Sequence, residues 1–147
     1  MRAAPSKSRK PSLGSSVAFV RSGCMDVHDD GGLTMTVPVR RVVSHIAAHL
    51  ESPLRLDGLA AVSGLTARGL QTAFVREVGM SPMKYVQLLR LHAARVRLIE
   101  ADHTDGATVY AIAQRFRFSN ASRFAVAYAK LFGEAPSVTL RFRTARQ

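Results

Sequence analysis

The chain has 147 residues, of which 47% are hydrophobic, so it has enough length and apolar content for one folded domain and is not disordered throughout. Its 21 Lys and Arg residues outnumber its 10 Asp and Glu residues, which gives a formal charge of +11 and a pI near 11.2. This excess favours a polyanionic partner, nucleic acid before an anionic membrane surface.

The cysteine count and hydropathy exclude several other classes of protein. A lone cysteine, Cys24, rules out an internal disulfide framework and a cysteine-rich zinc site. No apolar run approaches the ~20 residues of a membrane span, and residues 17–20 are far too short for a signal-peptide core. We therefore expect a cytoplasmic protein without a membrane partner.

Residues 1–38 differ in composition from the rest of the chain. They are dense in Ser, Gly, Pro, Arg and Lys, and their apolar residues are too scattered to form a face. Five basic and three acidic side chains give them a net charge of +2, whereas sixteen and seven give residues 39–147 a net charge of +9. We expect a flexible basic arm at 1–38 and a folded domain at 39–147 that carries most of the partner-binding charge.

The first predicted helices form a recognisable unit. A helix that begins at Pro38 and ends near residue 52 has apolar residues at helical spacing: Val39, Val42, Val43, Ile46, Ala47 and Leu50. A short helix over residues 56–63 ends before Gly64, and Thr66 is a candidate N-cap of a helix that runs to residue 78. Two helices separated by a tight turn with glycine are typical of a helix-turn-helix unit, whose second helix enters the major groove of DNA.

The longest predicted helix follows, over residues 83–101, with Ser81 as N-cap and Pro82 in the first turn. The helical period places these residues inward: Tyr85, Leu88, Leu89, His92, Ala93, Val96 and Ile99. For Arg90 on this helix we expect a structural role as partner of a carboxylate such as Glu77.

A second unit repeats the first. After a loop at residues 102–106, Thr108 can cap a short helix through Phe116, and Ser119 can cap a further helix that ends at Gly133. The repeat preserves the core positions, the cap, the terminating glycine and the next proline, with one residue more in the second copy. The sequence thus predicts an all-α fold with two helix-turn-helix units joined by a long linker helix.

The linker length is compatible with binding of both units to one DNA duplex. A helix of roughly 19 residues spans about 28 Å, close to the ~34 Å between major-groove faces one helical turn apart. A single chain, acting as a monomer, can therefore occupy two adjacent groove segments.

Ordered motifs extend through residues 39–143: Leu59–Thr66, Arg68–Phe74, Gly79–Tyr85, Arg90-Leu91, Ala94-Arg95, Phe118–Phe124, Phe132-Gly133 and Pro136-Ser137. With these motifs the chain resembles the AraC/XylS transcriptional regulators. The resemblance implies a seven-helix DNA-binding domain that regulates transcription near promoters, more often as an activator.

The family usually has a glycine where Arg117 stands, so the second turn is expected to be less regular or more basic. Most relatives carry a further sensing or dimerising domain, and this chain resembles those without one, or a fragment.

The helical phase selects the candidate DNA contacts. The candidate base contacts are Arg68, Gln71, Thr72, Asn120, Ser122 and Arg123. The first three match the family's base-contacting positions: Arg suits guanine, Gln suits adenine, and the Thr methyl suits that of thymine. The other three include fewer side chains that can form two hydrogen bonds to one base. We therefore expect this half of the domain to contribute more phosphate contacts and more recognition of DNA shape. The candidate backbone contacts are Ala67, Arg76, Arg115, Arg117 and Lys130.

Catalytic and metal sites are not supported by the pattern. His45 and His49 have the i, i+4 spacing of a zinc-peptidase helix, but Ile46 stands where that motif needs Glu. Cys24 and His28 are four residues apart with acidic residues around them, but no third ligand or ordered scaffold supports a metal site there. We therefore predict no enzyme activity, no cofactor and no metal.

One alternative of a different class stays open. The chain could be a helical protein-interaction module that binds RNA polymerase or another regulator without reading DNA. The outward Arg68, Gln71 and Thr72 argue against it, because an interaction helix would more often expose an apolar patch there.

Overall fold

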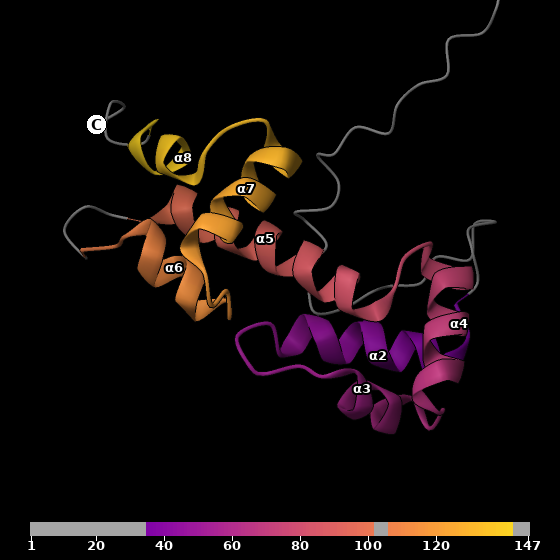
Figure 1. Cartoon of the computed structure of the whole chain (residues 1–147). Coiled ribbons are helices and arrows are strands. Elements are labelled where there is room, and N and C mark those ends of the chain that lie inside the picture. The colour runs from indigo at the N-terminus through magenta and orange to yellow at the C-terminus, as the bar shows by residue number, and fades with distance from the viewer. Residues whose placement is uncertain (1–34, 102–105, 143–147) are drawn as a thin grey trace, which may run out of the picture.

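The computed structural model describes residues 35–101 and 106–142, which form seven helices and no strand (Figure 1). They are α2 (Val37–Ala48), α3 (Leu56–Ser63), α4 (Ala67–Val78), α5 (Pro82–Glu100), α6 (Val109–Arg115), α7 (Ala121–Phe132) and α8 (Pro136–Phe142). The all-α, seven-helix prediction is confirmed. Helix α2 begins at Val37 and Met35 packs against the core, so the fold begins before residue 39. The rest of the expected arm, residues 1–34, lies outside the described residues.

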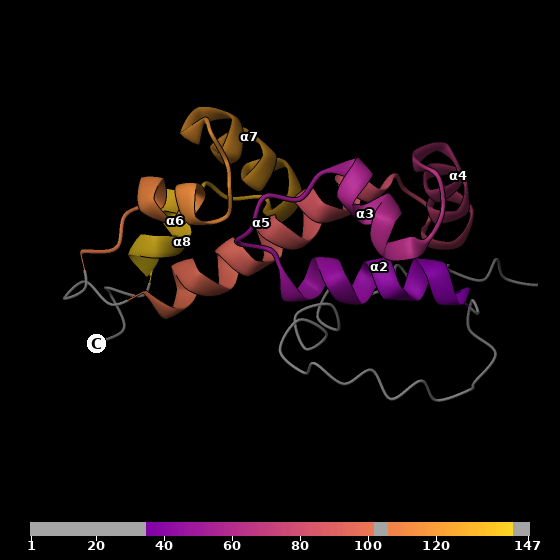
Figure 2. The ribbon, with the colours of Figure 1, turned by 90° about the horizontal axis from the view of Figure 1, so that it is seen from below.

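Two groups of helices lie at opposite ends of α5 (Figures 1 and 2). Helices α2, α3 and α4 pack on one another, and so do α6, α7 and α8. Helix α5 packs against α4 near its start and against α6 and α8 further along. The groups are the two predicted helix-turn-helix units, and α5 is the predicted linker.

The predicted helix boundaries depend on caps and glycines that the structure contains. The side chains of Thr66, Ser81 and Thr108 each accept a hydrogen bond from the backbone N–H three residues further on. Gly79 and Gly133 follow α4 and α7 in the left-handed conformation, with φ of 84° and 75°, which glycine adopts without a Cβ clash. These contacts confirm all three predicted caps and the predicted ends at both glycines.

The turn between α6 and α7 differs from the prediction. The N-cap of α7 is Asn120, not Ser119: its side-chain Oδ1 accepts the N–H of Arg123 at 2.9 Å. Counted from the left-handed residue of each turn, the cap follows two positions after Gly64 and three after Arg117. The extra residue of the second copy therefore lies inside its turn, and both Ser and Asn are good caps, so composition alone did not separate them.

The candidate recognition helices are anchored in the same way. Leu70 and Phe74 of α4, and Phe124 and Tyr128 of α7, are completely buried at i and i+4. Phe74 packs against Tyr85 of α5, and Phe124 packs against Phe118 and Tyr128. Two large buried side chains fix the rotation of each helix about its own axis, which determines the side chains that face solvent.

The buried face of α5 was only partly predicted. Leu89 and His92 are buried as expected, but Ile99 is 40% exposed. The buried residues of α5 are Pro82, Val86, Leu89, Leu91, His92, Ala94 and Leu98. Since α5 contacts α4 at one end and α6 and α8 at the other, its buried face changes along its length. A single helical stripe does not describe such a linker.

Candidate nucleic-acid interface

Helices α4 and α7 lie on the same side of the molecule, above α2 and α5 in Figure 2. On α4, the predicted base contacts Arg68, Gln71 and Thr72 are exposed in the first two turns. At the start of α7, Asn120, Ser122 and Arg123 are exposed as well. The structure therefore brings both predicted sets to the surface at the N-terminal ends of two anchored helices.

The three candidate side chains of α4 differ in what they can still donate or accept. Within the described chain, Arg68 and Gln71 have no side-chain partner, so all their polar atoms are available. The Thr72 hydroxyl donates to the carbonyl oxygen of Arg68 at 3.0 Å. Its donor is thus used inside the helix, and its methyl group is the part left for an apolar contact.

The candidate side chains of α7 are less free. Asn120 uses its Oδ1 as the cap of α7, which leaves its amide N–H groups to bind a partner. The guanidinium of Arg123 and the hydroxyl of Ser122 have no partner among the described residues. The second set therefore offers one cationic fork and two small polar groups.

The predicted backbone contacts fall into two classes. Arg117 and Lys130 are exposed and form no ion pair within the described ranges, and Ala67 is half-buried in the first turn of α4. In contrast, Arg76 pairs with Glu77 and Arg115 pairs with Glu51, each at 2.8 Å. The side chain of Arg76 is still 68% exposed, so it keeps free donors.

Glu77 does not bind Arg90, contrary to the expectation from the sequence. Its carboxylate accepts the N–H of Thr36 at 2.8 Å and the Thr36 hydroxyl at 3.0 Å. The hydrogen bond from Arg76, followed by those from Thr36, holds the pKa of Glu77 below its ordinary value. Glu77 thereby fastens the residues before α2 to the C-terminal end of α4.

Arg90 does have a structural role, but its partners are backbone carbonyls. Its Nε donates to the oxygen of Leu50 at 2.9 Å and its Nη2 donates to that of Ser52 at 2.7 Å. Burial, and then the nearby charge of Arg117, lowers the pKa of Arg90. Both carbonyls belong to the loop between α2 and α3, which the sequence pattern did not connect with α5.

A basic hollow lies between α5 and the turn before α7. Its volume is about 340 Å³, and three arginines line it, Arg90, Arg117 and Arg123, with no acidic residue. The sequence predicted Arg117 and Arg123 as separate contacts but not their convergence with Arg90. The signal for it was Arg117, a cation at a position where the family usually has glycine.

No metal-binding or membrane-spanning feature occurs in the part of the chain that the structure describes. His45 and His49 stack with ring centroids 4.2 Å apart, and no group of three metal-ligating side chains forms anywhere in these ranges. Burial, and then the neighbouring His49, lowers the pKa of His45.

None of the described helices is both long and apolar enough to cross a bilayer.

Comparison with known proteins identifies the family. A family model described as a helix-turn-helix domain matches residues 59–141. A probable AraC family transcriptional regulator from Rhodopseudomonas palustris has a similar structure, with a TM-score of 0.68 and 37% identity over 74% of this chain and 98% of that one. The chain belongs to the AraC/XylS family.

Two curated AraC/XylS relatives agree with this assignment. The probable thc operon regulatory protein of Rhodococcus erythropolis is 38% identical over 104 residues, which are 70% of this chain and 31% of that protein. The XylDLEGF operon transcriptional activator 3 of Pseudomonas putida is 34% identical over 103 residues, again 70% and 31%. The matched segment thus spans about a third of the length of these curated relatives.

Proposed function

We propose that this chain binds double-stranded DNA through α4 and α7, inserted into adjacent major-groove segments, and so regulates transcription. The observation that carries the proposal is the pair of equally anchored helices on one side of the molecule, each with exposed polar side chains in its first turns. Helix α5 has 19 residues, about 28 Å, which suits two groove faces one turn apart.

Base readout is assigned mainly to α4. Arg68 is suited to the O6 and N7 acceptors of guanine and Gln71 to the N6 and N7 of adenine, because each side chain presents two polar atoms in a fork. Thr72 contributes its methyl group to thymine, since its hydroxyl is already bonded. Asn120, Ser122 and Arg123 of α7 make the second, weaker set of base contacts.

Phosphate binding is assigned to the cations that keep free donors. Arg117 precedes α7, Lys130 lies in the last turn of α7, Arg76 lies on α4, and Ala67 contributes the free backbone N–H of a helix N-terminus. Arg117 and Arg123 of the basic hollow would bind a phosphodiester, because no acidic residue lines that hollow. Arg90 adds its charge there, while its guanidinium is bonded to the carbonyls of Leu50 and Ser52. Arg115 is left out, since its guanidinium is bonded to Glu51.

The finer biological role follows the relatives. The P. putida relative is named a transcriptional activator, which supports activation. The proposal adds RNA polymerase as the protein partner and the cytoplasm as the place of action. The chain acts by binding and not by catalysis, and needs no cofactor or metal. A single chain suffices because both helix-turn-helix units lie in it.

A mobility-shift titration against genomic fragments tests the proposal. Sequence-dependent retention is expected for the full chain, and it should weaken in Arg68→Ala. Arg41→Ala is the matched control, because Arg41 is exposed and lies on α2, outside both candidate recognition helices. Retention that does not depend on sequence, or none at all, would favour the protein-interaction module instead.

A further inference from the structure

Two arginines of the second half of the molecule hold one short loop of the first half. Arg90 of α5 binds the carbonyl oxygens of Leu50 and Ser52, at 2.9 and 2.7 Å. Arg115, the last residue of α6, binds the carboxylate of the residue between them, Glu51, at 2.8 Å. Three consecutive residues are therefore held from two directions.

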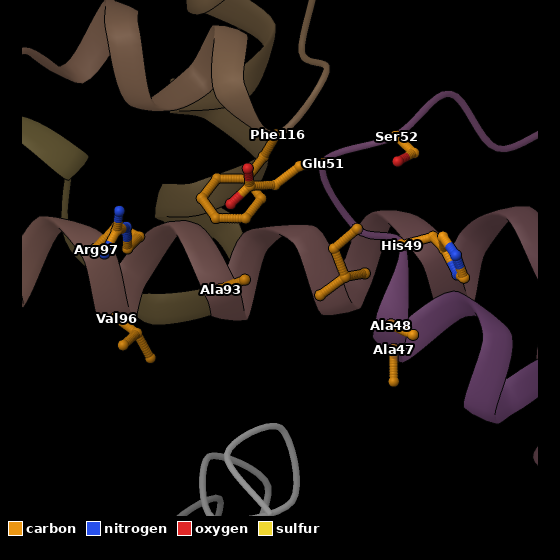
Figure 3. Close-up of a pocket in the computed structure, with 10 residues that line it drawn as sticks. Ala47, Ala48, His49, Glu51, Ser52, Ala93, Val96, Arg97 and Phe116 are labelled. Carbon is orange, nitrogen blue, oxygen red and sulfur yellow. The ribbon is translucent and has the colours of Figure 1, made fainter. Parts of the chain in front are cut away.

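The loop is continuous with the core of the first unit. Leu50 is 7% exposed and belongs to the buried cluster, directly after the end of α2. Leu50, Glu51 and Ser52 also line a shallow cavity together with Ala93 of α5 and Phe116, the residue after α6 (Figure 3). Hence a movement of this loop relative to α6 would be a movement of one unit relative to the other.

The substantial helix packing between the two units runs through α5. Substantial helix packing joins α2, α3 and α4 with one another and α6, α7 and α8 with one another, and only α5 packs substantially against members of both groups. A swing of about 20° at the middle of α5 would displace a helix at its end, ~14 Å away, by about 5 Å. That exceeds the ~3.4 Å rise of one base pair, so the orientation decides whether both helices fit one site.

We propose that residues 50–52, held by Arg90 and Arg115, form a clasp between the two helix-turn-helix units that fixes the orientation of α7 relative to α4. The clasp thereby sets the spacing between DNA half-sites to which the chain can bind. This inference rests on the proposed binding of both helices to one DNA duplex. Glu51 and Arg115 are positioning residues in it. Arg115 does not anchor a phosphate.

The energetics agree with a role in orientation and not in overall stability. Both side chains of the Glu51–Arg115 pair are about half exposed, at 51% and 48%. Exposed pairs add little to folding free energy because solvent screens them. A small energy is nevertheless enough to select one orientation among several of similar energy.

The first test measures orientation in the free protein. With Cys24→Ser, cysteines placed at Val75 of α4 and Val126 of α7, which are 51% and 70% exposed, carry spin labels for distance measurement. The parent should give one narrow distance distribution. Glu51→Arg and Arg115→Glu should each broaden or shift it, and the double variant should restore it. Arg41→Glu, a charge reversal at an exposed residue of α2, is the control and should leave the distribution unchanged.

The second test measures spacing on DNA. The affinity ratio between the preferred site and the same site with one base pair inserted between half-sites should fall about two- to fivefold in each single variant, the range expected for an exposed ion pair. The charge swap should restore the ratio. Because one protein binds both sites, general effects of charge on DNA affinity cancel in this ratio.

Opposite results would overturn the clasp. If the parent and both single variants share one distance distribution, or if the swap fails to restore it, the pair does not set the orientation. If Arg115→Ala lowers the salt dependence by about one counterion while Glu51→Ala leaves the spacing ratio unchanged, Arg115 is a phosphate contact. Distances that respond as expected in a protein that binds no DNA would refute the proposed function and leave the clasp intact.

Discussion

Arg117 is the residue at which this chain departs most clearly from its own repeat. It lies two residues after the end of α6 with φ of 65°, its N–H bonded to the carbonyl of Gln114 and the next N–H bonded to that of Ala113. The equivalent residue after α3 is Gly64, with φ of 74°. A residue with a Cβ is strained by roughly 1–2 kcal/mol in this conformation. The strain is retained at the edge of the basic hollow, where the cation serves the proposed contact with phosphate.

Replacing Arg117 with Gly should therefore raise the free energy of unfolding by roughly 0.5–1 kcal/mol. The relief of backbone strain in the folded state should exceed the free-energy cost of the greater conformational entropy that glycine gives the unfolded chain. Gly64→Ala is the matched opposite change and should lower it by about 1 kcal/mol, since nothing lies within 4 Å of a Cβ there and only the backbone conformation is penalised. Urea unfolding of both variants checks this. Equal stability of Arg117→Gly and the parent would mean that the turn is not strained.

Base readout by α4 gives a second prediction at the scale of the residue. Arg68→Ala or Gln71→Ala should each cost about 1–3 kcal/mol at the preferred site and relax preference at one or two base positions. Thr72→Val should keep the preference, because the methyl group remains and the lost hydroxyl served only its own helix. Titration against single-base site variants measures all three. An unchanged preference in both Ala variants would contradict the assignment.

His92 makes the second unit sensitive to acid. It is 7% exposed, packs edge-on against Phe132, and its Nδ1 has no partner within the described ranges. Burial, and then the charge of Arg95, lowers the pKa of His92 below its ordinary 6.5. As pH falls, His92 therefore takes up its proton at a higher pH in the unfolded chain than in the folded chain. The free energy of unfolding is unaffected by His92 protonation above pH 6.5 and decreases below it.

The free energy of unfolding should thus decline between pH 7 and pH 5. His92→Leu should make that decline shallower without abolishing it, because the pKa of His45 is lowered too. Thermal or urea unfolding across this range, for the parent and the variant, makes the comparison. An equally steep decline in both proteins would show that His92 is not the group responsible.

At the scale of the element, the sequence predicted α4 well because three independent signals coincide there. Thr66 caps it, Gly79 ends it, and the helical spacing of Leu70 and Phe74 sets its inner face. The inner face of α5 could not be predicted from one stripe, since that helix is buried against different partners at its two ends. The bonds of Arg90 and Glu77 depend on tertiary placement of distant segments, which helical periodicity does not contain.

The corrected cap of α7 gives a prediction for that element. Asn120→Ala should lower the free energy of unfolding by about 1 kcal/mol, because it removes the acceptor for the N–H of Arg123. Ser119→Ala, one position earlier, should change it by less than about 0.5 kcal/mol. Chemical denaturation of the two variants separates them. A larger loss in Ser119→Ala would restore Ser119 as the cap.

At the scale of the whole molecule, the two helix-turn-helix units make one chain equivalent to the two halves of a dimeric DNA-binding protein. Their recognition helices differ in the side chains that face outward, with Arg68, Gln71 and Thr72 on α4 but Ser122 and Arg123 on α7. Two unlike halves joined in a fixed order should read an asymmetric sequence. The clasp at residues 50–52 would fix the distance between the two parts of that sequence.

Selection of bound sites from random DNA, followed by measurement of the mass of the complex on the enriched site, tests this account directly. The expected result is an asymmetric motif of two unlike parts, centred about 10–10.5 base pairs apart and bound by a single chain. A palindromic motif bound only by two chains, or the absence of any enriched sequence, would contradict it.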